Sequence, residues 1–557
     1  MARKWSLAPE LYATADKQGD AHWMDVMRNQ DRSPVSTDSS KPRFTLVVGP
    51  SPFSMPRGWE FFLTAPYEGA TYIATVMHNA GYPTRIIDVR YDPTPLETAY
   101  REILKGTDVL GIATFEDNFP WVRELMDHVK FARPDIPIIA GGSLVTSVPH
   151  IFMGHTKTDI AVISEGELTI LELMESYAKG TWAEDLETIR GIWYRTEQGE
   201  VKKTAPRGQM PDLDSLPKMR LDLWPQYHSE KGLQPQIIAS YSRGCKMDCS
   251  FCYRTTPQVR SKSPEKFEED LNWLKSEYGT EFIFFSDLTF TSSKKQTLQN
   301  MDVLKGKDIR WTCLTRCADV DAERLTAMKE AGCDIALYGV ESLGKNILKE
   351  ARKGNSENIT IRSMHRTWDA GIRFGALLIV GLPGETEESL DHVAQWAEEH
   401  NHVTRVKYLS AMPGTTVYSQ GVRDGIIKSE VDHLNWLSIE QALYEDEFLN
   451  YNGLPEQVCR DAYKRMYDAY QPGPVMDFEH YPEHFLYHHA NPDDGQARST
   501  DYAGEGWRST HSSASPHLIP GSERFTLKNT GTEAMANAGA TYPSGAQVLG
   551  QHVAHAK

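Results

Sequence analysis

Short apolar runs alternate with helix-like segments between residues 44 and 180. Each run is apolar at nearly every position, which is typical of a strand buried on both faces. Such alternation predicts a parallel, doubly wound sheet with helices on both sides. The predicted strands are residues 44–49, 84–88, 109–113, 136–140 and 160–163.

A second series of the same kind begins near residue 236. Six apolar runs are separated by helical segments such as 264–277 and 322–331. Six successive βα units predict a partial (β/α)6 barrel, whose chemistry belongs at the carboxyl ends of the strands. The predicted strands are residues 237–241, 282–287, 310–316, 335–342, 373–381 and 403–408.

The segments around these two series differ in composition. A polar start, a turn-rich bridge with a hairpin at 192–195 and 199–202, an aromatic helical stretch and a Gly/Ser/Ala-rich end divide the chain. We predict an extension at 1–42, a first α/β domain at 43–185, a connector at 186–232, the partial barrel at 233–425, a helical substrate or lid region at 426–492 and a disordered tail at 493–557.

Composition narrows the class of protein. The chain has 557 residues, enough for several domains, and its net charge of −17 argues against a nucleic-acid partner. No apolar run is long enough to span a bilayer, and the first residues lack the apolar core of a signal peptide. All seven cysteines follow residue 240 without a disulfide-like pattern. We therefore expect a cytoplasmic protein with no membrane partner.

Three of those cysteines form a C-x3-C-x2-C cluster directly after the predicted strand 237–241: Cys245, Cys249 and Cys252. Three thiolates on one loop can hold three irons of a cubic 4Fe-4S cluster and leave the fourth iron open to a chelating ligand. The alternatives are a zinc site or three unrelated buried cysteines. Zinc sites usually pair two C-x2-4-C units or add histidines, and neither lies nearby. We interpret the cluster as an iron–sulfur site.

The strand ends of the first domain are rich in glycine and small hydroxyl residues. Such residues let backbone N–H groups approach a ligand closely, and ligands of doubly wound sheets lie over these ends. The pattern indicates a nucleotide-sized cofactor. The strand ends are residues 49–52, 114–118, 141–146 and 164–167.

The cysteine motif, with Tyr253 beside its third cysteine, resembles that of the radical S-adenosylmethionine (SAM) superfamily, and the resemblance covers about residues 236–420. It implies that SAM chelates the open iron and that the reduced cluster cleaves SAM to a 5′-deoxyadenosyl radical. Residues 412–415 are similar to the P-G-T turn of that family. The resemblance implies SAM contacts from Tyr253, Asp287, Arg316, Glu341, Ser342, Gly381 and Glu385.

Two of these residues have a structural alternative. Glu341 could form a buried ion pair, and Glu385 could be a helix N-terminal residue favoured by the macrodipole.

The first domain resembles the cobalamin-binding domain of one branch of that superfamily. In place of the D-x-H-x-x-G motif that supplies a histidine to cobalt, residues 88–92 read Asp-Val-Arg-Tyr-Asp. We therefore expect no histidine ligand from this loop, and consider Arg90, Phe115 and Glu116 for the lower face. A cofactor-free Rossmann-like module is the alternative. The resemblance implies cobalamin contacts from Thr114, Gly141, Gly142, Ser143, Glu165 and Gly166.

The two resemblances together imply a cobalamin-dependent radical SAM methyltransferase. Such an enzyme moves a methyl group from SAM through methylcobalamin to an unactivated carbon or a phosphinate phosphorus of a small natural-product precursor, as in antibiotic biosynthesis. The expected partners are this substrate and a flavodoxin- or ferredoxin-like one-electron reductant, and the chain is expected to be a monomer.

Two other functions stay open. One is a radical enzyme of the same layout that performs a cyclisation or rearrangement without methylation. The other is a non-enzymatic cobalamin or iron–sulfur sensor. The His-rich patch at residues 480–489 is interpreted as a solvated helix end rather than a metal site.

Overall fold

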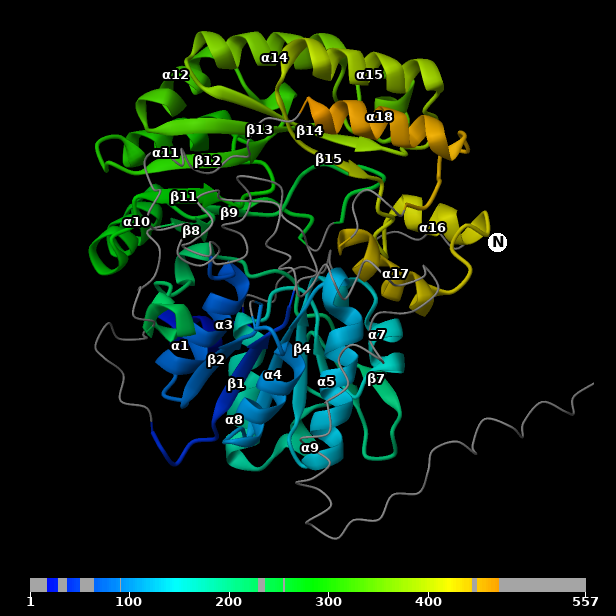
Figure 1. The fold of residues 1–557 in the computed structure, drawn as a ribbon. Coiled ribbons are helices and arrows are strands. Elements are labelled where there is room, and N and C mark those ends of the chain that lie inside the picture. Colours follow the sequence, from blue (N-terminus) through cyan, green and yellow to red (C-terminus); the bar gives the residue numbers. More distant parts are fainter. Residues whose placement is uncertain are drawn as a thin grey trace, which may run out of the picture.

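The computed structural model describes residues 18–28, 38–50, 65–90, 92–228, 236–253, 256–442 and 448–469. They form two α/β units stacked one on the other (Figure 1). The predictions for the first 17 residues, for the His-rich patch and for the tail at 493–557 lie outside the described residues.

The first sheet has seven strands in the order β2-β1-β3-β4-β5-β6-β7. Strands β1 to β5 are parallel, and β6 and β7 form the predicted hairpin. The order 2-1-3-4-5 is a doubly wound order whose ligand crevice lies between β1 and β3. The strands are β1 Phe44–Val48, β2 Thr84–Asp88, β3 Val109–Thr114, β4 Ile138–Gly142, β5 Ile160–Val162, β6 Ile192–Arg195 and β7 Val201–Lys203.

Helices cover both faces of this sheet, as predicted. One hydrophobic core holds α3 and α8, and another holds α4, α5 and α7 on the opposite face. Strand β4 begins two residues later than predicted, because Pro137 has no N–H to give to a ladder. The helices are α1 Ala21–Arg28, α3 Glu68–Asn79, α4 Pro95–Leu104, α5 Phe119–Ala132, α6 Ser143–Ser147, α7 Pro149–His155, α8 Glu167–Lys179 and α9 Trp182–Asp185.

The second sheet has six parallel strands that follow one another in sequence order. Its edge strands, β8 and β15, pair with no further strand among the described residues, so the predicted partial barrel is confirmed. A two-stranded antiparallel ribbon, β9 with β10, projects beside β8. The strands are β8 Gln236–Ala239, β9 Ser242–Arg243, β10 Arg260–Ser261, β11 Phe282–Phe285, β12 Arg310–Thr315, β13 Cys333–Glu341, β14 Arg373–Val380 and β15 Val403–Tyr408.

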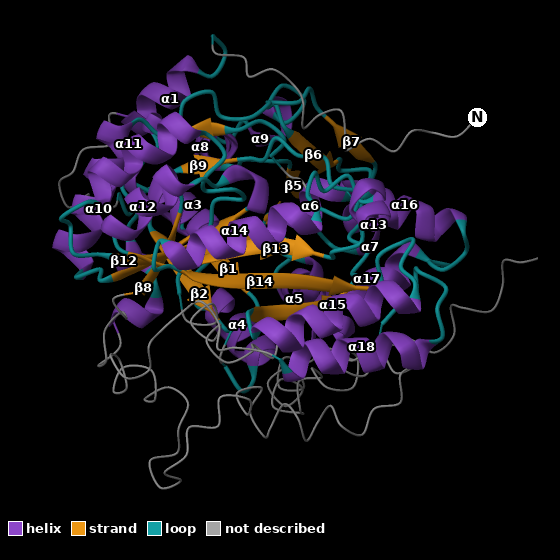
Figure 2. Cartoon of the chain, turned by 90° about the horizontal axis from the view of Figure 1, so that it is seen from above, coloured by secondary structure: helices purple, strands orange, loops and turns teal. Residues whose placement is uncertain are grey.

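The barrel helices lie on the outer side of the curved sheet (Figure 2), so its inner side faces the first domain (Figure 1). Most begin with a Ser, Thr or Asp side chain that accepts a backbone N–H of the first turn. The helices are α10 Pro264–Tyr278, α11 Lys294–Leu304, α12 Ala322–Glu330, α13 Lys345–Glu350, α14 Glu357–Asp369 and α15 Glu387–His400.

Three C-terminal helices follow: α16 Thr416–Arg423, α17 Glu430–Ala442 and α18 Glu456–Asp468. Helix α18 lies along α15 through ion pairs of Arg465 with Asp391 and Glu398. Helix α17 instead returns to the first domain, where Leu434 and Leu437 are buried in the core of α5 and α7. The described part of the predicted lid region therefore joins the two domains. No described helix is long and apolar enough to cross a membrane.

Candidate functional site

A cavity of about 770 Å³ lies between the carboxyl ends of the two sheets. The first domain contributes the ends of β1, β3, β4 and β5, and the barrel contributes the ends of β8, β11 and β15. Of the six predicted cobalamin contacts, five line it: Gly141, Gly142, Ser143, Glu165 and Gly166. Thr114 does not line it, since its hydroxyl donates to the carbonyl of Gly141 at 3.0 Å.

The cavity wall fits a large ligand with many polar groups. Glu116, Ser164 and Glu167 line the cavity. One side-chain oxygen of each (Oε1, Oγ and Oε2, respectively) is buried and has no hydrogen-bond partner among the described residues. A Cβ at Gly141 would meet no atom within 4 Å, so the backbone is open to a ligand there. Gly142 has φ +121, and a Cβ would lie 2.4 Å from the carbonyl oxygen of Thr114. These features fit cobalamin, whose amides would supply partners for the buried polar atoms.

The three candidates for the lower face of cobalt occupy different places. Arg90 does not line the cavity: it pairs with Asp88 at 2.7 Å and donates to the carbonyl of Ala65 at 3.1 Å. Phe115 and Glu116 do line it. Burial raises the pKa of Glu116. A lower-face role for Phe115 or Glu116 therefore stays a prediction.

The cysteine loop is held by the backbone on both sides. Cys245 donates its N–H to the carbonyl of Thr256 at 3.2 Å, and Ser250 donates to Ala351 at 2.9 Å. Gly244, with φ +95, permits the turn, because a Cβ there would lie 2.0 Å from the carbonyl oxygen of Gln258. All three cysteines are free thiols and half-buried.

Burial disfavours the charged form of two of these thiols. Burial raises the pKa of Cys249 and brings that of Cys252 to about 12, so their thiolates need nearby positive charge. Among the described residues, no three His, Cys, Asp or Glu side chains are close enough to hold one ion. A cubic cluster binds each thiolate at a different iron and needs wider spacing. The assignment of these three cysteines to the cluster stays a prediction.

Asp287, one of the predicted SAM contacts, binds the backbone of Tyr241 and Ser242 and the hydroxyl of Ser242 through its carboxylate. Its carboxylate accepts the N–H of Tyr241 at 3.3 Å and that of Ser242 at 2.7 Å. Burial raises its pKa to about 7. Asp287 thus braces the turn that leads into the cysteine loop, and its contact with SAM stays a prediction.

Glu341 forms the buried ion pair that the sequence left open. Its Oε1 lies 2.7 Å from Lys353 Nζ, and a Cβ at Gly339 would lie 2.5 Å from the same oxygen. Burial opposes the charge of Lys353, but Glu341 and the thiol of Cys249 raise its pKa. Lys353 is therefore a cation beside the cysteine loop, and no motif in the sequence pointed to it.

Arg316 and Ser342 lie at neighbouring strand ends. Arg316 donates to the carbonyl of Lys353 at 3.0 Å and pairs with Asp319 at 3.0 Å. Its Nε is buried without a hydrogen-bond partner among the described residues. Ser342 is buried and accepts the N–H of Gly344. Their roles toward SAM stay predictions.

Glu385 links the end of β14 to the segment before α18. Its Oε2 accepts the N–H of Gly381 at 2.8 Å and the amide of Asn452 at 3.1 Å. Burial raises its pKa to about 7. A capping residue, Thr386, begins α15 directly after it. Glu385 thus lies before α15 and binds Gly381 and Asn452, which does not match a helix N-terminal residue favoured by the macrodipole; its contact with SAM stays a prediction.

Glu385→Gln should change how stability depends on pH. Between pH 4.5 and 7 the folded protein holds a proton on Glu385 that the unfolded chain lacks, so the unfolding free energy of the wild type falls as pH rises. The loss is roughly 3 kcal/mol. Glutamine keeps both acceptor contacts and does not titrate. Urea unfolding at pH 5 and pH 8 should show that the unfolding free energy of the variant, relative to that of the wild type, is higher at pH 8 than at pH 5. The exposed control Glu388→Gln should show the same difference from the wild type at both pH values. The same result for Glu385→Gln would contradict the prediction.

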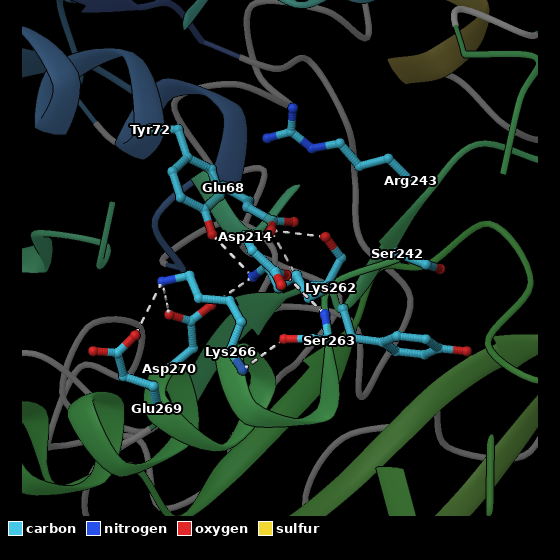
Figure 3. Close-up of polar contacts among 12 residues, drawn as sticks. Glu68, Tyr72, Asp214, Ser242, Arg243, Lys262, Ser263, Lys266, Glu269 and Asp270 are labelled. Atoms are coloured by element: carbon cyan, nitrogen blue, oxygen red, sulfur yellow. Dashed lines mark hydrogen bonds and ion pairs between the residues drawn. The ribbon is translucent and has the colours of Figure 1, made fainter. Parts of the chain in front are cut away.

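Several contacts join the two domains beside the cavity. Glu68 accepts the N–H and hydroxyl of Ser240 at 3.1 and 2.8 Å. Lys262 Nζ lies 3.1 Å from the hydroxyl of Tyr72 and 2.8 Å from Asp270, within the network shown in Figure 3. Sequence reasoning missed these residues, because their partners are distant in the chain.

Comparisons with known proteins agree with both halves of the site. A family model described as the radical SAM superfamily matches residues 239–397, and one described as the B12 binding domain matches residues 63–174.

Among curated relatives, an uncharacterized methyltransferase of Pyrococcus horikoshii is 27% identical over 67% of this chain and 81% of its own length. The cytidylyl-2-hydroxyethylphosphonate methyltransferase of Streptomyces wedmorensis is 24% identical over 69% and 82%. An anaerobic magnesium-protoporphyrin IX monomethyl ester cyclase of Rubrivivax gelatinosus is 25% identical over 53% and 54%. The chain thus spans most of the two methyltransferases and about half of the cyclase.

The fold also matches a solved structure. TsrM from Kitasatospora setae, a radical S-adenosylmethionine methyltransferase with cobalamin and a 4Fe-4S cluster bound, superposes with a TM-score of 0.56 over 77% of this chain and 89% of that one. The identity is 17%, so the likeness shows a shared fold.

Proposed function

Because the chain belongs to the cobalamin-dependent radical SAM methyltransferase family, we propose that it methylates an unactivated carbon or a phosphinate phosphorus of a small biosynthetic molecule. The proposal includes a flavodoxin- or ferredoxin-like reductant, a monomeric state and a cytoplasmic location. One observation carries it: the same cavity is lined by both domains. The first domain lines it with the ends of β4 and β5, residues 141–143 and 164–167, which we call the cradle, and the barrel lines it with the strand ends near the cysteine loop.

In this proposal, cobalamin and the cluster supply methyl transfer and one-electron cleavage of SAM, and the protein supplies alignment. Cys245, Cys249 and Cys252 hold the cluster, and Lys353 offsets part of its negative charge. The Gly141–Gly142 turn and the buried oxygens of Ser164 and Glu167 receive cobalamin.

Substrate then lies between the two cofactors. Leu288, Lys407 and Met412 bring the barrel side of the cavity wall to this region. Helix α17 binds the first domain through Leu434 and Leu437, which closes the junction beside it and keeps bulk water from the reacting groups.

The test uses the full chain with its cluster reconstituted under anaerobic conditions. Hydroxocobalamin, a chemical reductant and methyl-labelled SAM are added, and labelled cobalamin and 5′-deoxyadenosine are measured. We expect label on cobalamin. Absence of label despite 5′-deoxyadenosine release would overturn methylation, and absence of both products would favour the sensor.

The cyclase relative favours one second candidate, a radical reaction without methylation. Its similarity covers 53% of this chain, against 69% for the phosphonate methyltransferase. Release of 5′-deoxyadenosine without labelled cobalamin is the result that this candidate requires.

A further inference from the structure

The cysteine loop begins and ends at the same place. Strands β9 and β10 flank it and pair antiparallel, so that Arg243 lies opposite Arg260 and Ser242 opposite Ser261. A contact that fixes the position of this two-stranded ribbon therefore fixes both ends of the loop that carries Cys245, Cys249 and Cys252.

Both arginines of the ribbon bind one carboxylate of the first domain. Arg260 donates to both oxygens of Glu165 at 2.7 Å, and Arg243 Nη1 donates to Glu165 at 3.2 Å. Arg243 also binds Glu167 at 2.7 Å. The bidentate pair fixes orientation as well as distance.

These ion pairs are withdrawn from water. The exposed fractions of the side chains are 8% for Glu165, 16% for Arg243 and 13% for Arg260. Glu165 also accepts the N–H of Met210 at 2.5 Å. With its oxygens occupied in this way, Glu165 is a cross-domain tether more than a free ligand for a cofactor.

A third contact comes from the middle of the loop. Tyr253, next to Cys252, donates its hydroxyl to the carbonyl of Ser143. Ser143 follows the Gly141–Gly142 turn of the cradle, and Glu165 and Gly166 form another part of the cavity wall. The loop thus contacts the cavity wall of the first domain through Tyr253, and the ribbon that flanks the loop contacts the same wall through Glu165.

The ribbon has a further anchor that does not involve Glu165. Arg243 lies over the ring of Tyr72 with its guanidinium carbon 5.4 Å from the centroid, and Lys262, directly after β10, binds the hydroxyl of Tyr72 (Figure 3). Loss of Glu165 should therefore loosen the ribbon without detaching it.

We propose that Glu165 is a positioning residue that couples the two cofactor sites, so that assembly of the cluster raises the affinity of the protein for cobalamin. A loop held by a cluster presents Arg243 and Arg260 in fixed positions, and these order the Glu165–Gly166 wall of the cradle. By linkage, bound cobalamin favours cluster assembly by the same factor. The inference rests on the proposed use of both cofactors.

The test measures binding, without turnover. Hydroxocobalamin is titrated into cluster-loaded and cluster-free wild-type protein, and the two dissociation constants are compared by difference absorbance. We expect tighter binding to the loaded form by about 5- to 150-fold, the usual range of coupling between sites. In Glu165→Gln this ratio should fall close to one.

Two further variants make the result specific. Glu172→Gln is the matched control: Glu172 lies on α8 and pairs with Arg207, outside the ribbon, and its ratio should equal that of the wild type. Glu165→Gln combined with Arg260→Gln removes both partners and leaves no new lone charge from that pair, so it guards against misfolding of the single variant. It should also lose the coupling.

A wild-type ratio of one, or an unchanged ratio in the Glu165 variants, would overturn the inference. Coupling that persists in a protein that never labels cobalamin would contradict the proposed methylation and leave the coupling intact. Methyl transfer to cobalamin without coupling would contradict the inference about Glu165 and leave the proposed methylation intact.

Discussion

Cys249→Ala should yield a folded protein that cannot assemble its cluster. Three thiolates bind three irons, and loss of one exposes a second iron that has no protein ligand. The expected iron and sulfide content after reconstitution falls to background, and 5′-deoxyadenosine production falls with it. The same loss is expected for Cys245→Ala and Cys252→Ala, because all three lie on one loop.

The fold should survive this change. Cys249 is half-buried in a loop, and its backbone neighbour Ser250 keeps its hydrogen bonds to Ala351 and Val417. Burial raises the pKa of the Cys249 thiol, so without iron it contributes no charged contact at neutral pH. Circular dichroism and thermal unfolding of cluster-free variant and wild type should therefore agree.

Cys459→Ala provides the matched control. Cys459 is buried in α18 on the outer side of the barrel, where it contacts Asn452. This variant should bind a full complement of iron, with at most a modest loss of stability from the small cavity. A Cys249→Ala protein with wild-type iron content and SAM cleavage would contradict the cluster assignment.

The sequence predicted those features that depend on neighbouring residues. The spacing of three cysteines, the apolar runs of β1 to β5 and the six βα units are local patterns, and each was found. The start of β4 was misplaced by two residues because the apolar run includes Ile136 and Pro137, and proline cannot join the ladder.

The features that the sequence did not predict depend on contacts between residues far apart in the chain. Asp287 and Glu385 lie at strand ends, as a SAM contact would, but each carboxylate also binds a residue far away in the chain: Ser242, 45 residues from Asp287, and Asn452, 67 residues from Glu385. Glu165 lies in a cofactor-like loop, yet its partners are 78 and 95 residues away. The return of α17 to the first domain has the same origin, since its apolar residues alone do not specify which core they enter.

Gly141→Phe should weaken cobalamin binding by about 100-fold, equivalent to about 2.7 kcal/mol. Gly141 lines the cavity, and a Cβ there would meet no protein atom within 4 Å. The added ring therefore occupies part of the cavity in which cobalamin is proposed to bind. The change in unfolding free energy should stay within roughly 1 kcal/mol, since phenylalanine suits a strand better than glycine does.

Two controls separate loss of space from loss of fold. Gly154→Phe on α7 also adds a ring where a Cβ meets nothing, but outside the cavity, and should leave cobalamin affinity unchanged. Gly142→Ala should instead unfold the cradle, because its φ of +121 and the 2.4 Å approach to Thr114 exclude a side chain. Titration with hydroxocobalamin and thermal melting distinguish the three. Wild-type affinity in Gly141→Phe would mean that cobalamin does not lie over the β4 end, and the methyl route through this cavity would then fail with it.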